Sequence, residues 1–359
     1  MTDVFYVASR KGLFTYRRNG ADWETAAPQF LGEPVSAVLR DKRDGAIYAA
    51  LNLGHFGCKL HRSDDDGATW KELTPPAFPK AEDSAEDAPS VDLIWTLETG
   101  GDDEPGVLYA GVIPGGLFRS EDHGESWTLI ESLWNREERK GWFGGGYDKP
   151  GIHSILVDPR DSKKITLGVS CGGIWKSDDH GETWRLTGKG LRSDYTPPDQ
   201  SEELNTQDPH RLASCASDPD TIWCQHHNGI FLSRDGGETF VEFKDVKPAV
   251  FGFAVAVHPN DPDIAWLVPG VKDEYRVPVD GKLIVNKTTD GGKSFTPHAK
   301  GLPEPSYDLV FRHALDVDES GNRLIMGSTT GNLWASDDGG ASWRQLNAHL
   351  PPIAQVAFG

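Results

Sequence analysis

Histidine is the residue type whose placement most directly suggests chemistry in this chain. His153 begins the segment HSILVD and His313 begins the segment HALDVD. The two segments share one pattern of polar and apolar residues. His210 ends the segment QDPH, and His227 lies in CQHHNG. A neutral imidazole binds Zn, Mn or Fe, and it also transfers protons near neutral pH. We therefore predict these four histidines as metal ligands, with His153 and His313 also acting as catalytic residues.

Other polar and aromatic residues are expected to support this site. His55 in NLGHFG and Gln225 in CQHHNG complete the predicted metal ligands. Arg312 and Arg276 are predicted as further catalytic residues, because a guanidinium can bind a carboxylate through two parallel hydrogen bonds. The predicted substrate-binding residues are Arg10, Trp95, Tyr147 and Glu274.

A repeated element must position these residues, and the sequence contains one. The octapeptide Ser/Thr-x-Asp-x-Gly-x-Thr/Ser-Trp/Phe occurs six times, and successive copies begin 48 to 57 residues apart. This spacing is that of one four-stranded propeller blade. The copies span residues 63–70, 120–127, 177–184, 233–240, 288–295 and 336–343.

The octapeptide is predicted to form a structural hairpin turn. Its Asp accepts backbone hydrogen bonds, its Gly supplies a positive φ, and its aromatic residue packs between neighbouring sheets. It resembles the Asp-box (BNR) motif of sialidases, xyloglucan-degrading glycosidases, the sortilin family and photosystem assembly factors, and the chain is similar to short bacterial sialidase-like proteins. That resemblance implies a structural role. A turn needs its aspartate in every blade, whereas a site needs it once, so we do not expect these aspartates to be ligands or catalytic acids.

Strand-like segments surround each octapeptide and define a blade. Residues 152–159, 164–170, 173–177 and 183–186 give the four strands around the third copy. The chain begins with segments that match second and third strands, and residues 352–358 match a lone inner strand. The predicted fold is therefore all-β: one domain over residues 1–359, a seven-bladed β-propeller of four-stranded antiparallel blades. Pairing of the C-terminal strand with the N-terminal strands closes it.

Long loops indicate the face that carries a site. The octapeptides join third to fourth strands, so the other loops lie on the opposite face. Four segments exceed a tight turn, and such loops are usually functional or disordered. We expect a solvated flap at 80–90, an ordered wall at 131–151 and solvated acidic residues at 199–208. The long segments are 75–90, 131–151, 190–210 and 269–281.

Alignment of the inner strands suggests how two histidines could meet. His153 and His313 take the same strand position as Trp95 and Ser36 in two other blades. That position lies near the start of the inner strand, close to the propeller axis. We therefore expect His153 and His313 to share one site at the mouth of the central channel.

The composition limits which binding partners and which cellular compartment we expect. The formal charge of −19 repels phosphate backbones and anionic lipids, so we expect neither nucleic acid nor membrane as a partner. No basic, apolar leader or membrane-length apolar segment is visible, which favours a cytoplasmic protein. Four cysteines without a CxxC pair predict free thiols, although Cys215 and Cys224 are expected to face each other across a hairpin.

The resemblance implies the fold and leaves the activity open. Sialidases need an Arg-Ile-Pro segment, which this chain lacks, and their catalytic domains have six blades. The xyloglucan-degrading relatives place two catalytic aspartates between two propellers, whereas one propeller is predicted here. Seven-bladed oligogalacturonate lyases hold a divalent metal through His and Gln at the channel mouth, which is an analogy of site alone.

The leading hypothesis is a metal-assisted lyase or hydrolase that acts at the channel mouth on a small polar, saccharide-like or carboxylated substrate. The expected cofactor is Zn, Mn or Fe, without a nucleotide cofactor, and the expected partner is a small molecule or oligosaccharide. Two alternatives stay open: a non-catalytic protein-binding propeller, and a metal-independent glycoside hydrolase with paired carboxylates. The sequence leaves the oligomeric state open.

Overall fold

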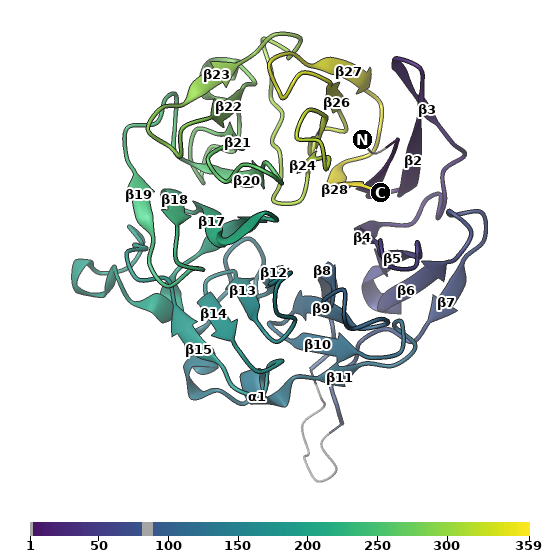
Figure 1. The fold of residues 1–359 in the computed structure, drawn as a ribbon, viewed down its shortest axis with the longest axis vertical. Coiled ribbons are helices and arrows are strands. Elements are labelled where there is room, and N and C mark those ends of the chain that lie inside the picture. Colours follow the sequence, from purple (N-terminus) through teal and green to yellow (C-terminus); the bar gives the residue numbers. More distant parts are fainter. Residues whose placement is uncertain (1–2, 81–88) are drawn as a thin grey trace. The chain divides into compact units, whose positions relative to one another are not determined.

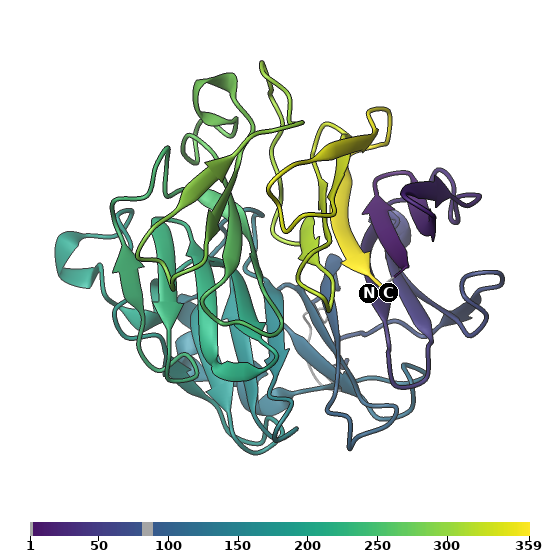
Figure 2. The ribbon, with the colours of Figure 1, turned by 45° about the horizontal axis from the view of Figure 1, so that its top comes forward.

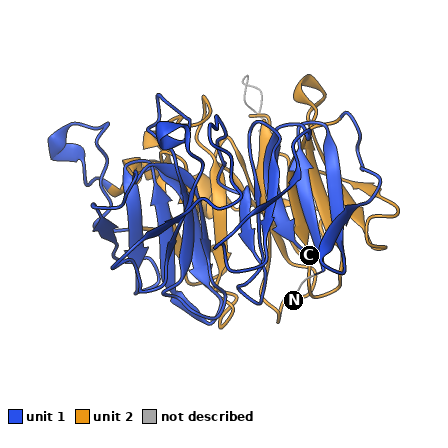
Figure 3. Cartoon of the chain, turned by 90° about the horizontal axis from the view of Figure 1, so that it is seen from above, with its two compact units in different colours: residues 1–32, 188–203, 208–359 blue, residues 33–187, 204–207 orange. Residues whose placement is uncertain are grey.

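The computed structural model describes residues 3–80 and 89–359, so most of the flap expected at 80–90 lies outside the described residues. The fold is all-β, with seven four-stranded antiparallel sheets that are the blades of a seven-bladed β-propeller (Figure 1). This confirms the predicted fold class. The residues divide into two compact units, unit 1 (1–32, 188–203 and 208–359) and unit 2 (33–187 and 204–207) (Figure 3). The single domain over 1–359 stays a prediction.

Unit 1 contains four sheets. The terminal sheet has the order β28-β1-β2-β3, and the other three follow the chain order. The terminal strands are β1 (Val4–Ser9), β2 (Gly12–Asn19), β3 (Asp22–Thr25) and β28 (Ile353–Phe358). The next sheets are β16 (Pro209–Cys215), β17 (Asp218–His226), β18 (Gly229–Ser233) and β19 (Val241–Phe243); β20 (Gly252–Val257), β21 (Ala265–Pro269), β22 (Val285–Thr288) and β23 (Thr296–His298); and β24 (Leu315–Val317), β25 (Leu324–Gly327), β26 (Leu333–Ser336) and β27 (Arg344–Asn347).

Unit 2 contains three sheets, each in chain order. They are β4 (Val35–Arg40), β5 (Ile47–Asn52), β6 (Cys58–Ser63) and β7 (Lys71–Leu73); β8 (Leu93–Thr99), β9 (Leu108–Ile113), β10 (Leu117–Ser120) and β11 (Thr128–Leu129); and β12 (Ile152–Val157), β13 (Ile165–Val169), β14 (Gly173–Ser177) and β15 (Arg185–Thr187).

Short helices occupy several of the connections. Helix α1 and η2 lie within 131–151, where Leu133 and Trp142 are buried, and the role of this segment as a wall stays a prediction. No helix in the described part of the chain is long and apolar enough to cross a membrane. The helices are η1 (Gly54–Phe56), α1 (Glu131–Trp134), η2 (Glu137–Gly141), η3 (Pro198–Gln200), η4 (Leu204–Thr206) and η5 (Val279–Gly281).

The two ends of the chain share one sheet. Strand β28 pairs antiparallel with β1, from Phe5 opposite Phe358 to Ser9 opposite Ile353. Figure 2 shows yellow β28 beside the purple N-terminal strands. The Phe5 ring stacks on Tyr16 at 4.9 Å and meets the Phe358 ring at 6.1 Å, so apolar contacts reinforce the ladder. The pairing predicted for the C-terminal strand is confirmed.

Deleting residues 352–359 should abolish cooperative unfolding or cause aggregation, because it leaves the apolar edge of β1 without its partner strand. Thermal unfolding followed by circular dichroism, with light scattering for aggregation, measures this. An unchanged melting temperature would contradict the role given to β28.

The octapeptide forms the predicted turn in six sheets. In the third copy, Asp179 Oδ1 accepts hydrogen bonds from Ser177 Oγ and from the Thr183 backbone N–H, both at 2.8 Å. Asp179 Oδ2 accepts a bond from Thr183 Oγ1 at 2.6 Å, and Gly181 N–H donates to Ser177 Oγ at 2.8 Å. The bonds from Thr183 hold the pKa of the Asp179 carboxyl below its usual value. The same bonds recur in the other copies, at Asp65, Asp122, Asp235, Asp290 and Asp338.

Two consecutive residues of each turn adopt a positive φ. The motif glycine of the third copy, Gly181, has φ 86°, and the residue before it, His180, has φ 60°. Three copies place a second glycine at that preceding position, namely Gly236, Gly291 and Gly339. The sequence predicts the positive φ of the motif glycine. The structure shows that the residue before this glycine also has a positive φ.

The aromatic residue that ends the motif packs as expected. Trp184 is buried in a core that also contains Tyr109 of β9 and Trp175 of β14, so this core lies between two successive sheets of unit 2. The Trp184 indole N–H donates to the Gly181 carbonyl at 3.0 Å. The turn of the third copy is thus held at both ends, by Asp179 and by Trp184.

Replacing Asp179 by Ala should lower the free energy of unfolding by about 1–3 kcal/mol, because one carboxylate accepts three hydrogen bonds within the turn. The neighbouring Asp178 is the matched control, since its side chain is 54% exposed and pairs only loosely with Arg185 at 3.5 Å. Asp178→Ala should change stability by less than about 0.5 kcal/mol. Chemical denaturation measures both variants, and equal losses would refute the structural role.

All four cysteines are free and buried, but two of them do not face each other as predicted. Cys224 lies opposite Leu212, and Cys215 lies opposite Asp218. The prediction of the register was wrong because β16 ends at Cys215 and β17 begins at Asp218, and the register also shifts between Ser214 and Cys215. The turn is therefore shorter than the sequence suggested.

Thiol titration of the denatured chain without reductant should count four thiols. The native chain should react slowly, because all four side chains are buried and burial raises the pKa of the Cys224 thiol well above its usual value. A count of two in the denatured state would instead reveal a disulfide.

Candidate functional site

One position near the start of the inner strand is shared by several blades. The register of five inner strands shifts around Ser36, Trp95, His153, His210 and Phe253. A bulge takes its residue out of the ladder and re-aims the side chain. This confirms that the first three share a position, and His210 of β16 takes the corresponding position in its own blade.

A carboxylate in unit 1 lies between two imidazoles. Asp208 Oδ2 is 3.3 Å from His210 Nε2 and 3.5 Å from His227 Nδ1. Asp208 and His210 are buried, whereas the His227 side chain is 24% exposed, so the cluster opens at His227. The expectation that the acidic residues of 199–208 are all solvated is therefore wrong for Asp208.

Backbone contacts orient the cluster. His210 Nδ1 lies 2.7 Å from the Gly252 carbonyl oxygen, to which it donates, and the His210 ring stacks on Phe253 at 4.4 Å. A Cβ at position 252 would lie 2.6 Å from the carbonyl oxygen of Val268 in the neighbouring strand β21, so a larger residue there would displace the backbone that bonds His210. On the other side, His227 N–H donates to the Asp208 carbonyl at 3.0 Å. The three side chains are thus fixed by the first two strands of one blade and the inner strand of the next.

Electrostatics keeps Asp208 ionised. Burial raises the pKa of its carboxyl, but the His210 and His227 imidazoles and the Arg312 guanidinium outweigh burial and hold that pKa well below its usual value. Burial lowers the pKa of His210 against the pull of Asp208, and it lowers the pKa of the adjacent His226 to about 3. Burial thus favours the neutral forms of His210 and His226, while the groups around Asp208 favour its charged form.

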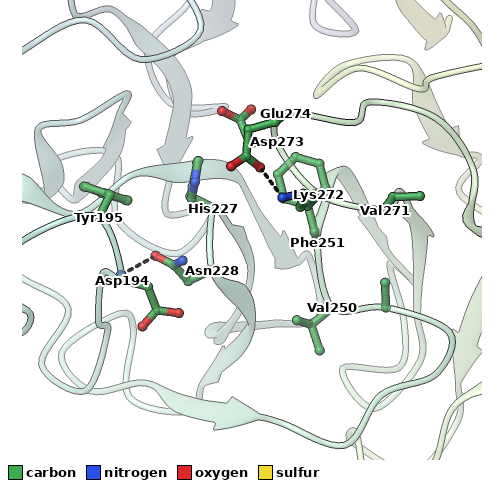
Figure 4. Close-up of a pocket in the computed structure, with 11 residues that line it drawn as sticks. Asp194, Tyr195, His227, Asn228, Val250, Phe251, Val271, Lys272, Asp273 and Glu274 are labelled. Atoms are coloured by element: carbon green, nitrogen blue, oxygen red, sulfur yellow. Dashed lines mark hydrogen bonds and ion pairs between the residues drawn. The ribbon is translucent and has the colours of Figure 1, made fainter.

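A pocket of about 600 Å³ borders His227. Its wall is formed by residues 194–195, 227–228, 249–251 and 271–274, and Figure 4 shows His227 between the first and the last of these segments. Asn228 Oδ1 accepts the Asp194 backbone N–H at 3.0 Å, which ties two parts of the wall together. The exposed edge of the cluster thus faces a space that can hold a small molecule.

The pocket combines carboxylates with aromatic rings. Each of its three carboxylates has a cationic partner: Asp194 pairs with Arg192, Asp273 with Arg276 and Glu274 with Lys272. Tyr195 meets the His227 ring edge-on at 5.1 Å, and Phe251 meets it at 6.0 Å. Further exposed aromatic side chains in unit 1 are Tyr275, Tyr307 and Phe311.

Several of the predicted site residues gather in this region of unit 1. His210 and His227 belong to the cluster, and Glu274 lines the pocket. The guanidinium carbons of Arg312 and Arg276 lie 5.1 and 5.4 Å from the centre of the Phe253 ring, on which His210 stacks. The two predicted catalytic arginines and two predicted ligands therefore share one neighbourhood.

A second group of predicted residues lies in unit 2. The Trp95 ring meets His153 at 5.3 Å and Tyr147 at 5.1 Å, and His153 is fully buried. His55 is exposed and its ring lies 4.0 Å from that of Phe56. The convergence of His153 with His313 stays a prediction, because the two residues belong to different units.

The remaining predicted residues of unit 1 have local structural contacts. Gln225 Nε2 donates to three carbonyls, those of His226, Gly229 and Val250, so its amide nitrogen is committed to the backbone. His313 forms a parallel bridge with Gln355, next to β24. The exposed Arg10 donates its backbone N–H to the Pro352 carbonyl at 3.0 Å.

Asp208 is the residue that the sequence reading missed. It lies two positions before His210 in the segment Asp-Pro-His. Residues two apart in an extended segment point to the same side. That spacing, at the start of an inner strand, is the signal that would have paired the carboxylate with the imidazole.

No protein-family model matches the chain. Curated relatives are xyloglucanases: that of Hypocrea jecorina is 29% identical over 146 residues, which is 38% of this chain and 16% of the fungal protein. The oligoxyloglucan-reducing end-specific xyloglucanase of Emericella nidulans is 21% identical over 316 residues, 80% of this chain and 36% of that protein. The chain therefore corresponds to at most 36% of the length of these two relatives.

Solved structures share the fold. An ancestral GH74 enzyme has a TM-score of 0.60 at 14% identity, covering 87% of this chain and 37% of that enzyme. YCF48 from Cyanidioschyzon merolae has a TM-score of 0.56 at 11% identity, covering 89% of this chain and 87% of that protein. The chain is similar to xyloglucanases in sequence, and it shares its fold with a GH74 enzyme and with YCF48.

Proposed function

We propose that the chain is a hydrolase that acts on a saccharide, with its reacting centre in the pocket beside Asp208, His210 and His227. The observation that carries this proposal is a buried carboxylate held between two imidazoles, one of which borders the pocket. Perturbed titratable groups beside a cavity are typical of catalytic sites.

The relatives favour hydrolysis over the lyase chemistry that the sequence left open. The proteins that match this chain are named as xyloglucanases, which are glycoside hydrolases, and one match extends over 80% of the chain. Because the chain corresponds to only part of those proteins, a saccharide substrate is proposed here as a class and xyloglucan is one member to test.

The pocket has the two kinds of surface that a sugar needs. The exposed ring of Tyr195 offers an apolar face to the C–H groups of a sugar ring, and the buried Phe251 ring packs against His227 in the pocket wall. Asn228 and Lys272 add polar groups for its hydroxyls. At the cluster, Asp208 and the imidazoles can polarise water or exchange a proton with the bond being cleaved.

The alternative of a glycosidase with paired carboxylates is less well supported by the same pocket. The Glu274 backbone N–H and then the Lys272 ammonium hold the pKa of the Glu274 carboxyl below its usual value. This lowering favours the ionised form of Glu274, whereas glycoside cleavage by paired carboxylates also requires a protonated general acid. A non-catalytic protein-binding propeller is the remaining alternative, and YCF48 shows that the fold also occurs in a peptide-bound protein.

Hydrolysis should be measured as the release of reducing ends from xyloglucan oligosaccharides and from a panel of neutral and uronate-containing oligosaccharides. We expect turnover of at least one substrate, and a loss of about 100-fold or more in kcat/KM for His227→Gln and Asp208→Asn, because either change disrupts the reacting cluster.

Glu274→Gln is the variant in the same pocket that tests the paired-carboxylate alternative, and it should lower kcat/KM by less than His227→Gln does. Loss of turnover in Glu274→Gln with retention in His227→Gln would support paired carboxylates instead. Absence of turnover on every substrate would favour the protein-binding alternative.

A further inference from the structure

We propose that Asp208, His210 and His227 bind one divalent transition-metal cation of the zinc type, through Oδ2, Nε2 and Nδ1 respectively. The inference shares its residues with the proposed hydrolase but concerns binding, so it can hold whether or not the chain cleaves saccharides. Among the described residues these three side chains bring their ligand atoms within 4.8 Å of one another.

The distances fit a small cation at the centre. Zinc lies about 2.0–2.1 Å from nitrogen and oxygen ligands, and in tetrahedral geometry this separates two ligand atoms by roughly 3.4 Å. Asp208 Oδ2 lies 3.3 Å from His210 Nε2 and 3.5 Å from His227 Nδ1. Two edges of a coordination tetrahedron are therefore already formed.

The hydrogen bond of His210 selects the ligand atom. Its Nδ1 donates to the Gly252 carbonyl at 2.7 Å, so the neutral ring carries its lone pair on Nε2. Nε2 is thus the ring nitrogen that faces Asp208 Oδ2, at 3.3 Å, and is placed to bind a cation together with it. A carbonyl that fixes the tautomer in this way is the usual companion of a metal-binding histidine.

The donor set and its surroundings indicate the kind of cation. Two imidazoles with one carboxylate suit Zn, Mn or Fe, whereas Ca and Mg prefer ligands that are all oxygen. Asp194, Asp273 and Glu274 along the pocket are each paired with a cationic side chain, so the charge that attracts a cation here is that of Asp208, and the Arg312 guanidinium acts against it.

The exposure of the cluster indicates a catalytic type of centre. Asp208 and His210 are buried, while His227 is partly exposed and borders the pocket. Three protein ligands with a remaining position open to a cavity are the pattern of catalytic zinc sites, and structural sites use four protein ligands. A cation here would polarise a water or a sugar oxygen bound in the pocket.

The test is metal binding by the full chain, after chelator treatment and dialysis, with Zn²⁺ and Mn²⁺ each added alone. Isothermal titration calorimetry should give one site per chain, and elemental analysis after desalting should recover one ion. Co²⁺ should produce visible absorption bands whose intensity reports four- or five-coordinate geometry. Failure of the wild-type chain to bind any of these ions would overturn the inference and leave a protonated imidazole as the partner of Asp208.

Variants locate the site. Asp208→Asn and His227→Gln should weaken binding at least about 10-fold, with unchanged circular dichroism. His227→Gln guards against misfolding, because this side chain is partly exposed and Asp208 is not. His349→Gln is the matched control, since His349 is an exposed histidine of the same unit, and it should bind like wild type. Equal affinity in Asp208→Asn and wild type would place the ion elsewhere and overturn the inference.

Binding and hydrolysis can fail separately. Metal bound at one ion per chain without cleavage of any saccharide would support this inference and contradict the proposed function. Cleavage by metal-free chain at the full rate, together with no binding, would support the hydrolase and overturn the metal site.

Discussion

The hydrogen-bonded aspartate turn is the constraint on which the rest of this structure depends. In each of six sheets it fixes the end of the third strand, and the carboxylate is bonded to a hydroxyl and to a backbone N–H within eight residues. Because this end of each blade is specified locally, the loops at the other end can vary in length and composition. In the blade of β16 to β19, the turn at 226–229 that carries His227 and the octapeptide that begins at Ser233 lie at opposite ends of β18.

A second structural feature, a β-bulge at the start of the inner strand, shapes the candidate site. At His210 the bulge takes the side chain out of the ladder, and the neighbouring inner strand supplies both the Gly252 carbonyl and the Phe253 ring that hold the imidazole. Asp208 then sits where burial alone would protonate it, but the imidazoles and Arg312 keep it ionised. A carboxylate that stays charged although burial removes its hydration is more typical of a functional site than of a structural one.

The fold could be predicted because its signals are local and repeated. The octapeptide marks each third-to-fourth turn, and the unmatched strand at 353–358 had one available partner, the edge of β1. The register of β16 against β17 could not be predicted, since it depends on a bulge and on a turn of two residues. A shift of this kind leaves no clear trace in hydrophobic alternation.

The site was predictable in part, for a related reason. His210, His227, Arg276, Arg312 and Glu274 were selected from the sequence and lie in one region of unit 1, but Asp208 was assigned to solvent with its acidic neighbours. Asp208 is buried because β16 and β17 pack around it, and no local sequence pattern predicts that packing. Gln225 is the opposite case. Its side-chain chemistry suggested a ligand, but in the structure its amide nitrogen donates to three backbone carbonyls.

The most direct test of the central claim, that Asp208, His210 and His227 form a metal-binding site beside the pocket, is anomalous diffraction from crystals grown with Zn²⁺, recorded on both sides of the zinc absorption edge. The account predicts one strong peak within about 2.0–2.2 Å of Asp208 Oδ2, His210 Nε2 and His227 Nδ1, with its open side toward the pocket. An empty cluster, with Zn²⁺ at other histidines or at none, would contradict it.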